Sequence, residues 1–216
     1  MSIHMCWNQD ISLNTFIFSV FALLFIYITN TYTRYKTPAF DNKIAYLFAL
    51  SISSMQLLEY FIWKHLNHKK MNRYLSILGL LLVWSQLFFG LLLADNPLLL
   101  GLFFLFSCTL YLYKSIYHPF HFETVVAENG HLSWEWLRVD GAEKIWLILG
   151  LFFYAIPFAN TLNSMIGALL FILAYVYYQK DNTYGSMWCW LINVLLLKTM
   201  IDILLIQPFY EYNGLC

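Results

Sequence analysis

Seven runs of mostly apolar residues, separated by short polar stretches, make up most of the 216-residue sequence. A helix needs roughly 17–25 such residues to cross about 30 Å of hydrocarbon, and most of the runs reach that length. The pattern therefore predicts an all-α membrane protein, a single polytopic domain over residues 1–216. The predicted transmembrane helices cover residues 11–30, 44–63, 74–94, 97–114, 145–158, 162–178 and 187–207.

The fifth and sixth runs are the shortest, and Pro157, Asn160 and Asn163 lie around the point where they are split. Proline interrupts a helix and asparagine favours turns, so a tight helical hairpin is expected there. The alternative is one kinked helix and six spans. Its run of about 34 residues exceeds a single crossing even with tilt. We therefore predict seven spans, with the two termini on opposite sides of the membrane.

The long loop between the fourth and fifth spans has a pattern of its own. Two β-prone runs, residues 121–127 and 131–139, flank Asn129-Gly130. Asn-Gly in this position is a strong hairpin signal, so a short β-hairpin is predicted. The second run presents large apolar residues on one face at strand spacing, namely Leu132, Trp134 and Trp136. That face is expected to cap the helix bundle or to lie against lipid headgroups.

Composition narrows the partners of the chain. Hydrophobic residues make up 61% of it and charged residues 11%, against roughly a quarter in an ordinary soluble domain. A lipid bilayer is therefore the expected surrounding. The net charge is zero and no nucleic-acid-binding motif occurs, which argues against nucleic acid as a partner. The aromatic-rich exterior suits self-association, but no Gly-x-x-x-Gly face defines an interface, so a homo-oligomer is left open.

Positive charges are distributed unevenly between the two sides. The loops on the N-terminal side carry eight basic residues: Lys64, Lys69, Lys70, Arg73, Lys114, Arg138, Lys144 and Lys180. The other side carries Arg34, Lys36 and Lys43. Basic loops stay in the cytoplasm, so the prediction is a cytoplasmic N-terminus and a C-terminus on the opposite side. All six histidines and seven of the eight tryptophans also map to the N-terminal side, which predicts a structured face there.

The second span carries polar residues in the middle of an apolar helix. Gln56, Glu59 and Trp63 fall on one helical face, and Asn193 of the seventh span reaches a similar depth. A carboxylate in hydrocarbon is costly, so it faces protein or trapped water. We interpret these four residues as a binding site for a small ion or polar ligand. The alternative is that they hydrogen-bond to one another and only fix helix packing.

Two further sets of residues are candidates for chemistry. Cys6, His118, His121 and Cys189 are expected on the same side of the membrane, and Cys, His and carboxylates are the usual ligands of zinc. They have no zinc-finger spacing, so a zinc site is an alternative hypothesis. In the seventh span Lys198 and Asp202 lie four residues apart, which predicts a buried ion pair.

Three short motifs support the idea of one site. They are Cys6-Trp7 before the first span, Gln56-x-x-Glu59-x-x-x-Trp63 in the second, and Gly185-Ser-x-Trp-Cys189 before the last. Together with the span layout they resemble an uncharacterised family of small multi-pass membrane proteins from bacteria and large DNA viruses. The resemblance implies that the three motifs form one site, and it implies no activity.

The sequence thus favours an integral membrane protein that is a small transporter, channel or sensor with a polar site near Glu59. The alternative is an intramembrane metal-dependent enzyme or metalloprotein that uses the Cys/His cluster. A structural membrane protein, viral or other, with no site is the third hypothesis. No catalytic residue and no cofactor follow from the sequence.

Overall fold

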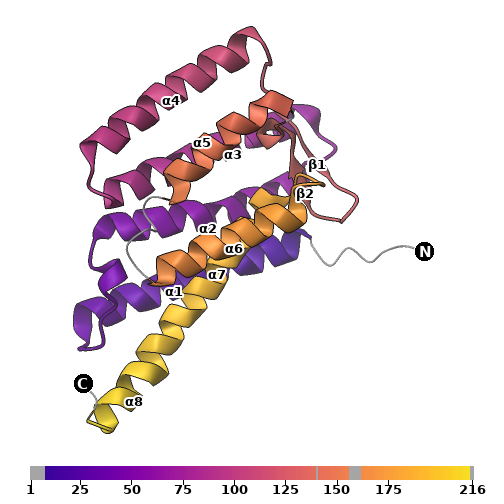
Figure 1. The fold of residues 1–216 in the computed structure, drawn as a ribbon. Coiled ribbons are helices and arrows are strands. Elements are labelled where there is room, and N and C mark those ends of the chain that lie inside the picture. The colour runs from indigo at the N-terminus through magenta and orange to yellow at the C-terminus, as the bar shows by residue number, and fades with distance from the viewer. Residues whose placement is uncertain (1–7, 140, 156–161, 215–216) are drawn as a thin grey trace.

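The computed structural model describes residues 8–139, 141–155 and 162–214, most of which are helical (Figure 1). Its apolar helices are α1 (Gln9–Tyr32), α2 (Lys43–Lys64), α3 (Lys69–Leu93), α4 (Pro97–Ile116), α5 (Lys144–Ala155), α6 (Leu162–Tyr178) and α7 (Tyr184–Ile201). A π-helical turn, Asp202–Ile206, continues α7 into α8 (Gln207–Tyr212). Strands β1 (Thr124–Val126) and β2 (Leu132–Trp134) pair antiparallel. The predicted all-α fold with a short hairpin between the fourth and fifth helices is confirmed.

Five helices in the described part of the chain are long and apolar enough to cross a membrane. They are α1, α2, α3, α4 and the continuous helix Tyr184–Tyr212. By contrast, α5 has 12 residues and α6 has 17, about 18 and 26 Å at 1.5 Å per residue. The end of the predicted fifth span and the turn after it fall on residues 156–161, outside the described residues. The prediction of seven crossings is thus supported for five helices and stays a prediction for α5 and α6.

Capping groups decide where the helices begin. The Asn8 side chain accepts hydrogen bonds from the N–H groups of Asp10 and Ile11, at 3.0 and 3.1 Å, and so starts α1. In the same way the His68 side chain accepts a hydrogen bond from the N–H of Met71, the third residue of α3, and starts this helix. This helix therefore begins at Lys69, five residues before the predicted span, because a basic turn outside the apolar run is helical too.

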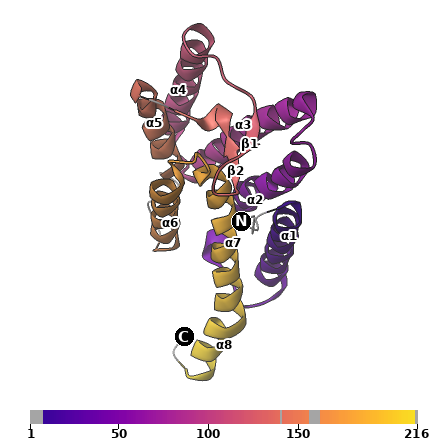
Figure 2. The same ribbon diagram turned by 90° about the vertical axis from the view of Figure 1, so that its right-hand side faces the viewer.

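The helices pack side by side as a bundle with two ends (Figure 1). We call one of them the hairpin end, because the β-hairpin lies there with the starts of α1, α3, α5 and α7 and the ends of α2, α4 and α6. At the other end the Tyr35 hydroxyl, between α1 and α2, donates a 2.7 Å hydrogen bond to Glu211 in α8. Helix α4 lies at the edge, packed against α3 and α5 and away from α1 (Figure 2).

The hairpin closes its end of the bundle with aromatic rings. Gly130 in the turn has a φ of 81°, a conformation that favours glycine. Trp134 of β2 and Trp136 of the following turn stack with ring centroids 5.2 Å apart and are 2% and 4% exposed. Leu132 on the same face is fully buried. Of the two placements expected for this face, the structure has the cap over the bundle.

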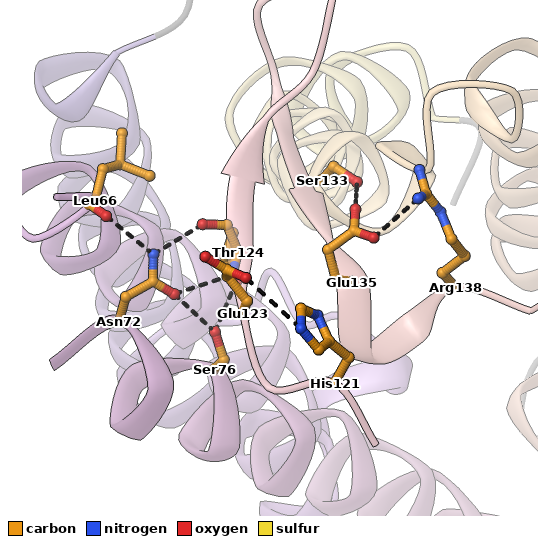
Figure 3. A network of polar contacts seen from close by, with 9 residues as sticks. All are labelled: Leu66, Asn72, Ser76, His121, Glu123, Thr124, Ser133, Glu135 and Arg138. Atoms are coloured by element: carbon orange, nitrogen blue, oxygen red, sulfur yellow. Dashed lines mark hydrogen bonds and ion pairs between the residues drawn. The ribbon is translucent and has the colours of Figure 1, made fainter. Parts of the chain in front are cut away.

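A buried asparagine fixes the hairpin to α3 (Figure 3). Asn72 accepts a 2.9 Å hydrogen bond from the N–H of Thr124 and donates a 2.8 Å bond to the carbonyl of the same residue. The Ser76 hydroxyl adds contacts with Asn72 at 3.2 Å and with the Thr124 hydroxyl at 2.9 Å. On the other side, Asn182 donates a 2.8 Å bond to the carbonyl of Trp134. The hairpin is thus held by side chains from two directions.

Asn72→Ala is expected to loosen the hairpin. It leaves the N–H and C=O of Thr124 without their partner in a buried place, which costs about 1–3 kcal/mol. Hydrogen exchange of purified protein should show faster exchange in residues 124–134 and an unchanged α1. Asn213→Ala, which removes an exposed bond to Phe209, is the control and should change neither. Unchanged exchange in the hairpin of Asn72→Ala would contradict this account of its attachment.

Candidate functional site: a buried polar seam

Polar side chains occupy the interior where α1, α2 and α7 pack against one another. Each of these three helices contacts the other two. Six polar side chains on them are 0% exposed: Ser12, Ser19, Ser53, Gln56, Glu59 and Ser186. We call this set, together with Asn193, the polar seam. Bundle interiors of this kind are normally apolar, so the seam is a candidate site.

The acidic member of the seam lies one helical turn from an amide. Gln56 Nε2 donates a 3.2 Å hydrogen bond to Glu59 Oε2. The Ser186 hydroxyl and the Cys189 thiol of α7 lie close to the carboxylate, with Ser186 outside hydrogen-bond geometry. Glu59 Oε1 has no hydrogen-bond partner among the described residues, and no basic side chain there pairs with it. One carboxylate oxygen is therefore buried without a partner among the described residues.

Other buried polar atoms on the same helices share this property. Among the described residues no hydrogen-bond partner is found for Ser12 Oγ, Ser53 Oγ, Gln56 Oε1, Trp63 Nε1 and Ser186 Oγ. Buried polar atoms nearly always have a partner, because desolvating them without one is costly. Most of these atoms are acceptors or hydroxyls, and the Trp63 indole is a donor. The arrangement suits a proton, a small cation or a small polar molecule.

Asn193 is buried, and its hydrogen bonds go to residues other than Glu59. Its Oδ1 accepts a 2.6 Å hydrogen bond from the Ser19 hydroxyl, and its Nδ2 donates a 3.1 Å bond to the carbonyl of Trp190. It thus joins α7 to α1 and is not bonded to Glu59. Within the polar seam, Asn193 and Ser19 form a contact of their own, which holds α7 against α1.

Two of the three sequence motifs meet in the structure. Glu59 of the α2 motif lies beside Ser186 and Cys189 of the α7 motif. The third motif, Cys6-Trp7, lies outside the described residues. A glycine is needed at position 185, where α7 approaches the hairpin, for a steric reason. A Cβ on it would lie 2.5 Å from a ring carbon of the buried Trp134, so only glycine lets α7 approach the hairpin so closely.

The candidate zinc ligands are dispersed. The side chain of His118 is 61% exposed and 3.9 Å from Glu143, and that of His121 is 72% exposed and 3.8 Å from Glu123. Cys189 is buried inside the bundle instead. Within residues 8–139, 141–155 and 162–214 no three His, Cys, Asp or Glu side chains are grouped so that they could hold a metal ion. Since Cys6 lies outside these ranges, a zinc site stays a prediction.

Lys198 and Asp202 form the predicted ion pair, but the pair is not buried. The two side chains are 40% and 34% exposed. Neighbouring helices still cover one face of the helix at this level, since Ile203 is 2% exposed and clusters with Leu23 and Ala49. The ion pair therefore lies on a face that these neighbours leave partly uncovered. Asp202 begins the π-helical turn, 18 residues after α7 starts at the hairpin end.

An apolar chamber that the sequence did not predict lies below the hairpin. The chamber has a volume of about 140 Å³ and lies between α3, α4, α5 and the start of α7. Five of the eight tryptophans line it: Trp84, Trp134, Trp136, Trp146 and Trp188. On its wall Trp188 donates a 2.6 Å bond to the Tyr154 hydroxyl, which donates to Gln86 at 3.3 Å. The crowding of tryptophans on one side of the membrane was the sequence signal for it.

No protein-family model, no curated protein and no solved structure matches this chain. The fold and the seam define a helical protein whose long apolar helices suit a membrane and whose interior holds a carboxylate.

Proposed function

We propose that this chain is an integral membrane protein that transports or senses protons or small cations, with Glu59 as the binding group. The observation that supports this most is the environment of the carboxylate. Glu59 is 0% exposed, one of its oxygens has no hydrogen-bond partner, and no basic residue pairs with it in the described part of the chain. A buried carboxylate without a positive partner is destabilising in a static structural role, because its charge is not compensated.

A proton or cation compensates that charge. Hard cations prefer oxygen ligands, and Gln56 Oε1 and Ser186 Oγ are uncommitted oxygens on or beside the same turn of the seam. A proton needs only the carboxylate oxygen that has no hydrogen-bond partner. Intramembrane carboxylates of this kind mark ion and proton pathways. Both ligands therefore fit the site, and anions do not.

An ion would reach Glu59 by a shorter route from the hairpin end of the bundle than from the opposite end. Glu59 lies four residues before Trp63, about 6 Å deeper along α2, and α2 ends at Lys64. The proposal places this end in the cytoplasm, because the eight basic residues of its loops obey the rule that positive loops stay inside. The proposal also includes membership of the uncharacterised family of small membrane proteins from bacteria and large DNA viruses that the motifs resemble. That family suggests no activity for the site.

Flux through the wild-type protein tests the transport form of the proposal. The purified chain in lipid vesicles, under an imposed pH, Na⁺ or K⁺ gradient, is expected to dissipate at least one gradient faster than protein-free vesicles. Heat-treated protein in the same vesicles controls for leak. If all three gradients persist as they do in protein-free vesicles, the protein is no transporter or channel for these ions, and only the sensor form is left.

A further inference from the structure

A polar mouth adjoins the apolar chamber. The mouth has a volume of about 390 Å³ and lies at the hairpin end between α5 and α6. It shares three lining residues with the chamber: Val139, Leu147 and Tyr184. A ligand in the mouth therefore borders directly on the tryptophan-lined space.

Basic side chains surround the mouth. Arg138, Lys144 and Lys180 line it, and no acidic residue of the described chain does. Arg138 is paired with Glu135 at 2.9 Å, whereas Lys144 and Lys180 have no ion-pair partner among the described residues. Lys144 is the first residue of α5, and Lys180 comes two residues after the end of α6. Both thus lie where membrane helices end, which is the level of lipid headgroups.

We propose that the mouth and chamber together bind one membrane lipid with an anionic headgroup. The headgroup lies in the mouth, where two unpaired lysines attract its charge. A segment of one hydrocarbon chain lies past Leu147 in the chamber, whose size is close to that of an engineered apolar cavity of roughly 150 Å³ that binds benzene. The combination of a basic rim with an aromatic interior selects an amphiphile over either a free phosphate or an uncharged hydrocarbon. This site does not depend on the role of Glu59.

Glycine positions allow a clean test of the chamber. Gly150 lines it, and a Cβ there meets nothing nearer than Phe106 at 3.9 Å, so Gly150→Phe fills the space. Gly101 on α4 has no atom within 4 Å of a Cβ and is exposed, which makes Gly101→Phe the matched control. Lys144→Gln combined with Lys180→Gln removes the charge of the mouth at two exposed positions, where folding is not at risk.

The measurement is tryptophan fluorescence of the purified full chain in uncharged detergent, titrated with phosphatidylglycerol whose acyl chains are brominated. Bromine quenches nearby tryptophans, and five of them line the chamber. We expect saturable quenching, half complete at a concentration roughly tenfold lower than for brominated phosphatidylcholine. Gly150→Phe should lose the saturable part and Gly101→Phe should keep it. The double lysine variant should lose the preference for phosphatidylglycerol.

Three results overturn the proposal. They are equal quenching by the two lipids in the wild type, unchanged saturable quenching in Gly150→Phe, and an unchanged lipid preference in the double lysine variant. If Gly150→Phe does not fold, the lysine variant decides alone.

Discussion

Glu59→Gln is expected to abolish the ion or proton flux of the reconstituted protein while the fold survives. Glutamine has nearly the same shape, and its side-chain oxygen can still accept the hydrogen bond from Gln56. It carries no charge and cannot release a proton, so it cannot serve as a cation or proton site. We expect flux at the level of protein-free vesicles and an unchanged circular dichroism spectrum.

The matched control is a second glutamate at the same end of the bundle. The Glu123 side chain is 46% exposed and lies in the loop before β1. Glu123→Gln removes the same charge from the surface and should keep wild-type flux. A Glu59→Gln variant that still carries wild-type flux would exclude the carboxylate from the pathway.

Gly185→Ala is expected to destabilise the protein more than the same methyl addition at Gly79 or Gly101. The added Cβ would lie 2.5 and 2.7 Å from two ring carbons of Trp134 and 3.2 Å from Leu137 Cδ2. Trp134 is 2% exposed and stacked on Trp136, so moving it away from the added methyl group would disturb this stack. Overpacking of this kind costs about 1–3 kcal/mol, here divided between strain in α7 and displacement of the hairpin.

Thermal unfolding in detergent measures this effect, with Gly101→Ala as the control. That substitution adds the same methyl group to an exposed helical position with nothing within 4 Å, and it should be neutral or slightly stabilising. Since Gly185 lies one residue before Ser186, a displaced α7 should also lower flux in Gly185→Ala. Equal unfolding midpoints for the two variants would mean that α7 and the hairpin are less closely packed than described.

Much of the fold could be predicted because an apolar run of bilayer length has few structural options. Backbone polar groups in hydrocarbon must be satisfied within the segment, which leaves a helix. The hairpin followed from Asn129-Gly130, whose glycine does adopt a positive φ. The end of the predicted fifth span lies outside the described residues, so its length stays a prediction.

Residue spacing could predict only the part of the candidate site that lies within α2. The spacing of Gln56 and Glu59 put them on one face, and they do share a hydrogen bond. Their proximity to Ser186 and Cys189 of α7 was expected from the resemblance of the motifs, because spacing along the chain does not encode how helices pair. The contact of Asn193 with Ser19 joins residues 174 positions apart for the same reason. The i, i+4 spacing likewise predicted the Lys198–Asp202 pair, but its exposure depends on which helices cover it.

The most direct test of the role of Glu59 is an infrared difference spectrum of the membrane-embedded protein, recorded between two pH values and again with and without Na⁺, K⁺ or Ca²⁺. If Glu59 binds a proton or a cation, the wild type shows a carboxyl band that changes in at least one of these pairs of conditions and is absent from Glu59→Gln. This holds for a transporter and for a sensor alike. A carboxyl signal identical in the wild type and Glu59→Gln under every condition would contradict the account.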